Sequence, residues 1–122
     1  MRTKRPFVIF ERGQIIVAPF KFSDLDIYKV RPLLVVSHPD FCIATENLVA
    51  AMITTAGRSS WPLDIRIDEW ESVGLTFPCF VRMKLFTIAT IAVRDVLGRT
   101  TASTIESVEQ SLMALLFSGA RA

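Results

Sequence analysis

Most of the patterned segments in this chain are short and strand-like, and only the last one is helical. Strand patterns repeat every two residues and helix patterns every 3.6, so spacing separates the two. Five or six short strands followed by one closing helix favour a mainly β fold, built as a strongly bent sheet or a small barrel. The expected strands cover residues 13–18, 33–37, 48–54, 63–68, 80–86 and 87–93.

Individual residues indicate where some of these strands end. Pro19 is expected to end the first strand, because proline has no N–H to donate in a central ladder. The second strand, Leu33–Ser37, is apolar and is predicted to be buried on both faces. His38, Pro39 and Asp40 then predict a turn.

The final segment is predicted to be a helix that begins near Ser103. Ser103 and Glu106 match a capping box, in which the two side chains satisfy N–H groups of the first turn. Apolar residues then recur at helical spacing and form one stripe. Its members are Ile105, Val108, Leu112, Leu115 and Leu116.

The 122 residues fit a single domain, 1–122, with a basic N-terminal extension at 1–11. Mean hydropathy is +0.41, which indicates either a dense core or an apolar surface covered by a second copy. The longest apolar run, Cys79–Val93, contains Arg82 and Lys84 and is shorter than the roughly 20 residues of a membrane helix. The apolar stretch 7–10 is too short for a signal peptide, so a cytoplasmic protein is expected.

Several common catalytic arrangements are missing from the sequence. His38 is the only histidine, and Cys42, four residues later, has no further ligand pair near it to complete a zinc site. There is no glycine-rich phosphate loop and no Gly-x-Ser-x-Gly motif. We therefore expect no metal and no cofactor. The net charge of +2 is compatible with nucleic-acid binding and does not by itself indicate it.

A series of short motifs resembles one known family along most of the chain. The motifs are Gly13-Gln14-Ile15-Ile16 with Pro19-Phe20, Lys29-Val30-Arg31-Pro32 before an apolar strand, Ile53-Thr54-Thr55 with Pro62, Gly74-Leu75, and Pro78 to Lys84. In this order and spacing they resemble the MazF/PemK toxins. The resemblance implies an SH3-like barrel of the MazF/CcdB type. It also implies a homodimer and a type II toxin that cleaves single-stranded RNA through the ribose 2′ hydroxyl. Its partner would be an antitoxin with a flexible acidic and apolar segment.

By the same resemblance, Arg31 and Thr54 correspond to the catalytic arginine and threonine. A guanidinium offers a permanently charged fork of donors to phosphate oxygens, and a threonine hydroxyl can donate to the same phosphate. Thr55 is the alternative to Thr54. Outside the resemblance, an arginine before proline is equally typical of a charged strand edge, and threonine is an ordinary strand residue.

The resemblance also suggests residues that contact RNA. Arg82 and Lys84 lie two apart on a strand and are expected to present two cations to a groove. Aromatic side chains in loops can stack on bases, although Trp61 could equally fill the barrel end. The expected RNA-binding residues are Lys84, Arg82, Arg58, Lys29, Thr55 and Trp61, with Phe22 as a further stacking candidate.

The chain departs from the family pattern in its acidic positions. Gln14 replaces a frequent acidic residue, and Cys79 and Val81 occupy positions where some relatives have an arginine and an aspartate. These differences leave Asp24 or Asp26 as substitute candidates for the general base. Two alternatives to a nuclease therefore remain: a CcdB-like toxin that binds a protein target, and a member that binds RNA or antitoxin without cleaving.

Overall fold

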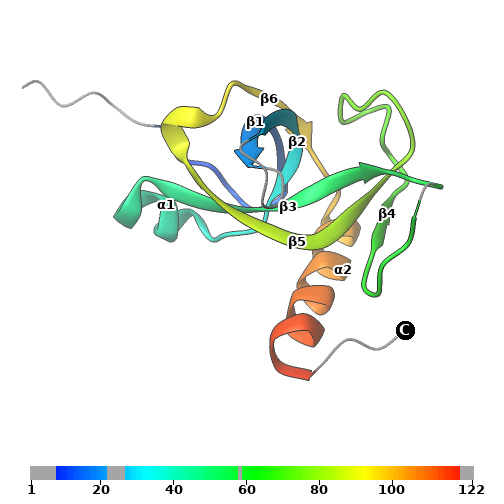
Figure 1. Cartoon of the computed structure of the whole chain (residues 1–122). Coiled ribbons are helices and arrows are strands. Elements are labelled where there is room, and N and C mark those ends of the chain that lie inside the picture. Colours follow the sequence, from blue (N-terminus) through cyan, green and yellow to red (C-terminus); the bar gives the residue numbers. More distant parts are fainter. Residues whose placement is uncertain (1–7, 22–26, 58, 119–122) are drawn as a thin grey trace, which may run out of the picture.

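The computed structural model describes residues 8–21, 27–57 and 59–118. Six strands form one antiparallel sheet in the order β4-β5-β3-β2-β1-β6. They are β1 (Gln14–Lys21), β2 (Tyr28–Val35), β3 (Asn47–Thr55), β4 (Ile65–Ile67), β5 (Cys79–Ala89) and β6 (Asp95–Arg99). The sheet curls into a half-barrel, with helix α2 (Ala102–Met113) following the last strand (Figure 1). This confirms the predicted mainly β fold with a C-terminal helix.

A long bent strand, β5, replaces the two strands predicted at 80–86 and 87–93, and that prediction was wrong. Its pairing with β3 shifts between Ala51, which faces Leu85, and Met52, which faces Arg82. The additional residues in β5 form a bulge, which bends a strand without ending it. A 3-10 turn (Thr90–Ala92) then leads into β6, which was not predicted.

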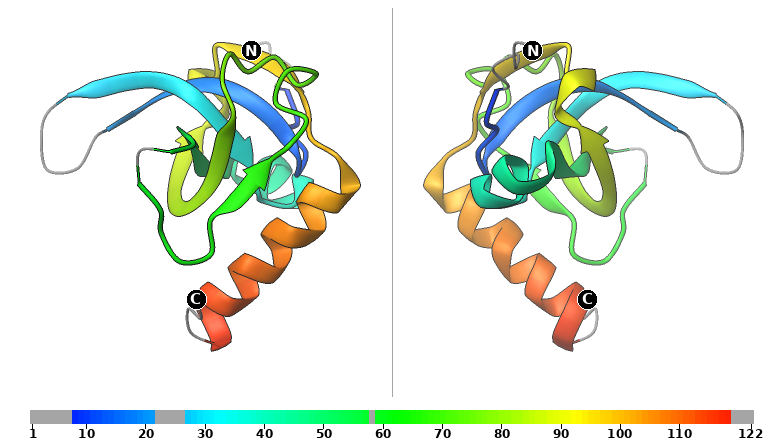
Figure 2. Two further views of the ribbon diagram at one scale, coloured as in Figure 1. Left: turned by 90° about the vertical axis from the view of Figure 1, so that its right-hand side faces the viewer. Right: turned by 90° about the vertical axis from the view of Figure 1, so that its left-hand side faces the viewer.

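Pro19 lies inside β1 and does not end it. It faces Val30 of β2, while the ladder to β6 on the other side stops at Val17. Beyond Val17 this edge of β1 has no partner strand among the described residues, so an N–H is not needed there. β1 and β2 consequently form a ribbon that reaches beyond the rest of the sheet (Figure 2).

The turn predicted at residues 38–40 is instead the start of helix α1 (Pro39–Thr45). The His38 Nδ1 accepts a hydrogen bond from the Asp40 N–H at 3.1 Å and caps the helix. Pro39 occupies the first turn, where a missing N–H has no cost.

Helix α2 starts two residues earlier than predicted. Its cap is Thr101, whose Oγ1 accepts from the Thr104 N–H at 3.2 Å, and not Ser103. Only the first part of the predicted stripe is covered: Val108 is buried, and Leu112 packs against the core. Leu116, near the end of the five-residue π-helical turn Ala114–Ser118, is 61% exposed.

Both faces of the curled sheet are packed. One cluster, which contains Ile15, Val81 and Val108, lies beneath α2, and the other contains Phe10, Leu33 and Cys42 of α1. Cys42 and Cys79 are both free thiols. No helix within the described residues is long and apolar enough to cross a membrane.

Candidate functional site

Arg31 and Thr54 lie on neighbouring strands, just beyond the last paired residues of β2 and β3. The last paired residues of the two strands in this direction are Leu33 and Met52. Side chains two residues apart share a face of a strand, so Arg31 lies on the face of Leu33, and Thr54 on the face of Met52. If the register continued, Arg31 would stand opposite Thr54.

The two strands separate beyond that last pair, and a groove opens between them. Residues 28–32 of β2 continue to pair with β1, while residues 53–55 of β3 continue to pair with β5. The groove has a volume of about 630 Å³. Its lining residues are Phe20, Lys29, Arg31, Pro32, Met52, Ile53, Thr54, Thr55, Leu75, Thr76, Phe77 and Cys79.

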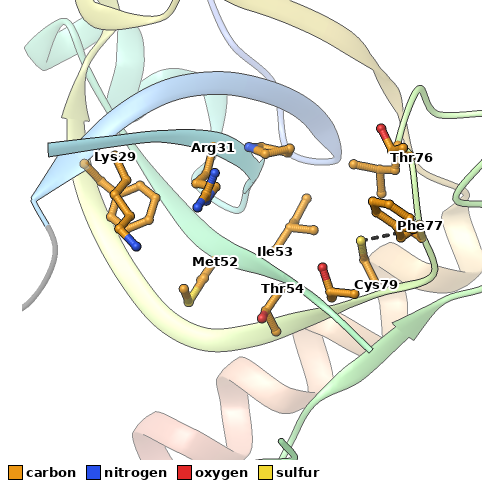
Figure 3. A pocket seen from close by; sticks show the side chains of 12 residues that line it. Lys29, Arg31, Met52, Ile53, Thr54, Thr76, Phe77 and Cys79 are labelled. Carbon is orange, nitrogen blue, oxygen red and sulfur yellow. Dashed lines mark hydrogen bonds between the residues drawn. The ribbon is translucent and has the colours of Figure 1, made fainter. Parts of the chain in front are cut away.

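The two ends of the groove differ in chemistry. Lys29 and Arg31 lie at one end, Phe77 and Cys79 lie at the other, and Thr54 lies between them (Figure 3). Both charged side chains among the described lining residues are cations, and three threonines also line the groove, with Thr76 beside Phe77 (Figure 3). Such a set of donors suits an anionic group, and phosphate in particular.

The Cys79 thiol is an unsuitable proton acceptor in this groove. It is 7% exposed, and burial raises its pKa above the ordinary thiol value. Its Sγ donates to the carbonyl oxygen of Phe77 at 3.0 Å. The described part of the groove lining contains no Asp, Glu or His.

Of the expected RNA-binding residues, Lys29 and Thr55 line the groove together with Arg31 and Thr54. Lys84 is partly buried on β5 and does not line it. Four residues proposed from the sequence, Phe22, Asp24, Asp26 and Arg58, lie outside the described residues.

Arg82 has a different environment from the one expected. It is 5% exposed, and its Nη2 lies 2.9 Å from the Asp64 carboxylate, while its Nη1 donates to the Ser59 Oγ at 3.0 Å. Its guanidinium carbon stands 4.7 Å from the ring centroid of Trp61. Arg82, on β5, therefore holds the segment before β4, which includes Trp61, against the sheet. The expected pair of groove cations at 82 and 84 is not formed, because the bulge in β5 interrupts the regular alternation there.

Phe77 and Met52 were missed by the sequence reasoning. Met52 is the last residue of β3 in this direction that pairs with β2, and the end of that pairing leaves no pattern in the local sequence. Phe77 did leave a signal, since it is a large aromatic residue between polar Thr76 and the loop residue Pro78. An aromatic side chain in such a loop is a candidate for an exposed contact.

The residues 11–116 match the family described as PemK-like, MazF-like toxin of type II toxin-antitoxin system. Among solved structures, an endoribonuclease from a mycobacterial species is 24% identical, with a TM-score of 0.69 over 90% of this chain and 93% of that chain. An endoribonuclease in complex with its cognate antitoxin, also mycobacterial, is 25% identical, with a TM-score of 0.68 over 87% and 93%. MazF from Deinococcus radiodurans shares the fold with a TM-score of 0.72 over 89% and 97% at 17% identity. A search of curated proteins gives no significant match. The chain belongs to the PemK-like, MazF-like family of type II toxin-antitoxin toxins.

Proposed function

We propose that this chain is an endoribonuclease toxin that cleaves single-stranded RNA in the groove between β2 and β3. The convergence of Arg31 and Thr54 on this groove, together with Lys29 and Thr55, carries the proposal. The endoribonucleases among its structural relatives support it. The ribose 2′ oxygen attacks the adjacent phosphorus, the bond to the next 5′ oxygen breaks, and a cyclic phosphate and a 5′ hydroxyl result.

Arg31 and Thr54 act on the phosphate that is attacked. Negative charge increases on the phosphorus oxygens as the 2′ oxygen approaches, and donors fixed in advance at those oxygens lower the barrier. The Arg31 fork binds two such oxygens, and the Thr54 hydroxyl donates to one of them. Lys29 and Thr55 contact neighbouring parts of the RNA backbone.

The reaction also needs a group that accepts the proton of the 2′ hydroxyl. A guanidinium is a donor without an acceptor atom, and burial raises the pKa of the Cys79 thiol, so neither Arg31 nor Cys79 is suited to accept this proton. Asp24 and Asp26, which lie in sequence between β1 and β2, remain the candidates for this role.

A second candidate function is binding of RNA without cleavage. It is favoured by the lack of a carboxylate or imidazole among the described residues of the groove lining. A CcdB-like toxin that binds a protein target has less support, because such a toxin does not need Arg31 and Thr54 in one groove.

The partners proposed for this chain are single-stranded RNA, a cognate antitoxin and a second copy of itself in the cytoplasm. One mycobacterial relative was solved in complex with its cognate antitoxin, and a Deinococcus radiodurans relative as MazE-MazF. An acidic and apolar antitoxin segment would suit a groove with cations at one end and Phe77 at the other.

The first prediction concerns cleavage itself. The purified protein, free of antitoxin, should cut a mixed single-stranded RNA in the presence of EDTA. Arg31→Ala and Thr54→Ala should each slow cleavage by about 100- to 1,000-fold, because each removes one donor to the transition state. Product ends identified by mass spectrometry should be a cyclic phosphate and a 5′ hydroxyl.

Matched controls in the same assay are Arg66→Ala and Thr87→Ala, which remove exposed side chains of the same types from β4 and β5. Both should keep wild-type rates. RNA binding without cleavage would replace the nuclease proposal with the second candidate. Cleavage that needs a divalent ion would contradict the metal-independent mechanism.

A further inference from the structure

A large aromatic side chain at the apolar end of the groove has no role in the mechanism above. Phe77 lines the groove, yet 59% of it is exposed. Exposure of an aromatic ring forgoes the stabilisation that its burial would give. Its ring lies in the same groove as Thr54 and Arg31, beyond Thr54 as seen from the cationic end (Figure 3).

The backbone that carries Phe77 is held on both sides. Before it, Leu75 is buried, and its N–H donates to the Trp70 carbonyl at 3.0 Å. After it, the Pro78 carbonyl accepts from the Ala56 N–H at 2.9 Å. The Phe77 carbonyl itself accepts from the Cys79 thiol. The exposed ring therefore stands on a fixed support, which limits the entropy lost when a ligand orders it.

We propose that Phe77 stacks on a nucleobase next to the phosphate held by Arg31 and Thr54. The proposal rests on the proposed function and adds a base contact to it. Unpaired RNA presents phosphates and bases in alternation, and proteins hold it with cations for the former and aromatic rings for the latter. The groove offers these two kinds of contact at its two ends.

The alternative occupant of this end is an apolar side chain of the antitoxin. The neighbouring donors favour RNA, because Arg31 and Thr54 together provide a charged fork and a neutral hydroxyl. A phosphodiester has several oxygens that can accept both. A stacking contact also explains an exposed flat ring, whereas an aliphatic side chain is usually received in a closed pocket.

The test uses the RNA sequence that the wild-type protein cuts fastest, made with 2′ fluorine so that it cannot be cleaved. Its affinity is measured by fluorescence anisotropy for the wild type, Phe77→Ala, Phe77→Leu and Phe77→Trp. Loss of a base–aromatic stack should weaken binding by roughly 5- to 150-fold in the alanine variant. Phe77→Trp should keep the affinity, and Phe77→Leu should not, because leucine preserves apolar bulk without a π face.

A second series replaces one base at a time by an abasic site. An abasic site at one position should weaken binding to the wild type and should not weaken binding to Phe77→Ala any further. This is the result expected if Phe77 and that base are in direct contact. Phe41→Ala, which removes a partly exposed aromatic of α1, is the control and should behave as wild type in both series.

Equal RNA affinity of wild type and Phe77→Ala, with cleavage intact, would overturn the stacking proposal and leave the nuclease standing. The same holds if Phe77→Ala weakens binding of the antitoxin peptide alone. A wild-type protein that neither binds nor cuts RNA would instead refute the proposed function, and the stacking proposal with it.

Discussion

At the scale of single residues, Arg31 and Arg82 show how environment decides what an arginine does. Arg31 is exposed on β2 and lines the groove, whereas Arg82 is buried and paired with Asp64. Arg31 could be identified from the sequence because its motif, Arg-Pro before an apolar strand, is local. The pairing of Arg82 could not, because its partner lies 18 residues away and meets it only after the sheet has curled.

The Arg82–Asp64 pair is expected to matter for stability. In Asp64→Ala, the guanidinium would remain buried without its counter-charge, which should lower the free energy of unfolding by about 3–5 kcal/mol. Urea unfolding followed by tryptophan fluorescence measures this change.

The control for this pair is Arg66→Ala. This variant breaks the ion pair between Arg66, whose side chain is 60% exposed, and Asp68, whose side chain is 84% exposed. It should lower the free energy of unfolding by less than about 1 kcal/mol. Similar losses in the two variants would show that the buried pair is not structurally important.

At the scale of elements, the presence of most strands was predictable and the ends of the elements were not. The strand around residues 48–54 is close to the observed β3, since its pattern is local. β6 contains Gly98 and only five residues, so it carries little pattern. The predicted start of α2 was two residues too late. Thr101 and Ser103 are both residue types that cap helices well, and a side chain distant in sequence, Glu69, stabilises the start at Thr101.

Glu69 joins the turn before β5 to the start of α2. Its Oε1 accepts from the Thr100 hydroxyl, from the Thr101 N–H at 3.3 Å and from the Thr104 hydroxyl at 3.3 Å. Burial raises the pKa of this carboxyl, but the hydrogen bonds together lower the pKa by more than burial raises it. The resulting pKa lies below the ordinary value of 4.5.

The direction of this pKa shift predicts that the contribution of Glu69 to stability depends on pH. A carboxyl with a lowered pKa in the folded state contributes stability above the unfolded pKa, and this contribution is lost as pH falls through the folded pKa. Glu69→Gln should therefore be less stable than wild type at about pH 7, with a smaller difference at about pH 3.

Thermal unfolding at both pH values tests this expectation. Glu71→Gln, in an exposed position of the same turn, controls for the loss of one negative charge. A stability difference between wild type and Glu69→Gln that stays constant with pH would contradict the role of the Glu69 carboxylate.

At the scale of the whole molecule, the curl of the sheet creates the groove. The order of short strands and a final helix was enough to predict a bent, mainly β fold. The groove was beyond such a prediction, because it depends on where β2 stops pairing with β3 and on the loop that carries Phe77. Arg31 and Thr54, the residues assigned to it from family motifs, both line the groove because they lie just beyond the last β2–β3 pair, on the faces of Leu33 and Met52.

The surface of the whole chain also carries an uncovered apolar area at the end of α2. Its members are Met113 at 57%, Leu115 at 37%, Leu116 at 61% and Phe117 at 75% exposure. Four large apolar residues exposed within five positions are unusual for a monomer and favour an interface. Together with the mean hydropathy of +0.41, this area is the expected contact between two copies.

Sedimentation of the wild type and of a charged variant tests whether two copies meet at the end of α2. Wild-type protein should sediment as a dimer at micromolar concentration, and Leu116→Asp should sediment as a folded monomer. Burial of a leucine side chain contributes about 1.5–3 kcal/mol to the free energy of association, and a buried unpaired carboxylate opposes association. Circular dichroism checks that the variant folds. Ile91→Asp places the same charge at a site that is 80% exposed between β5 and β6, and it should remain a dimer. A dimeric Leu116→Asp would move the interface elsewhere, whereas a monomeric wild type would mean that the groove of a single copy must hold the RNA alone.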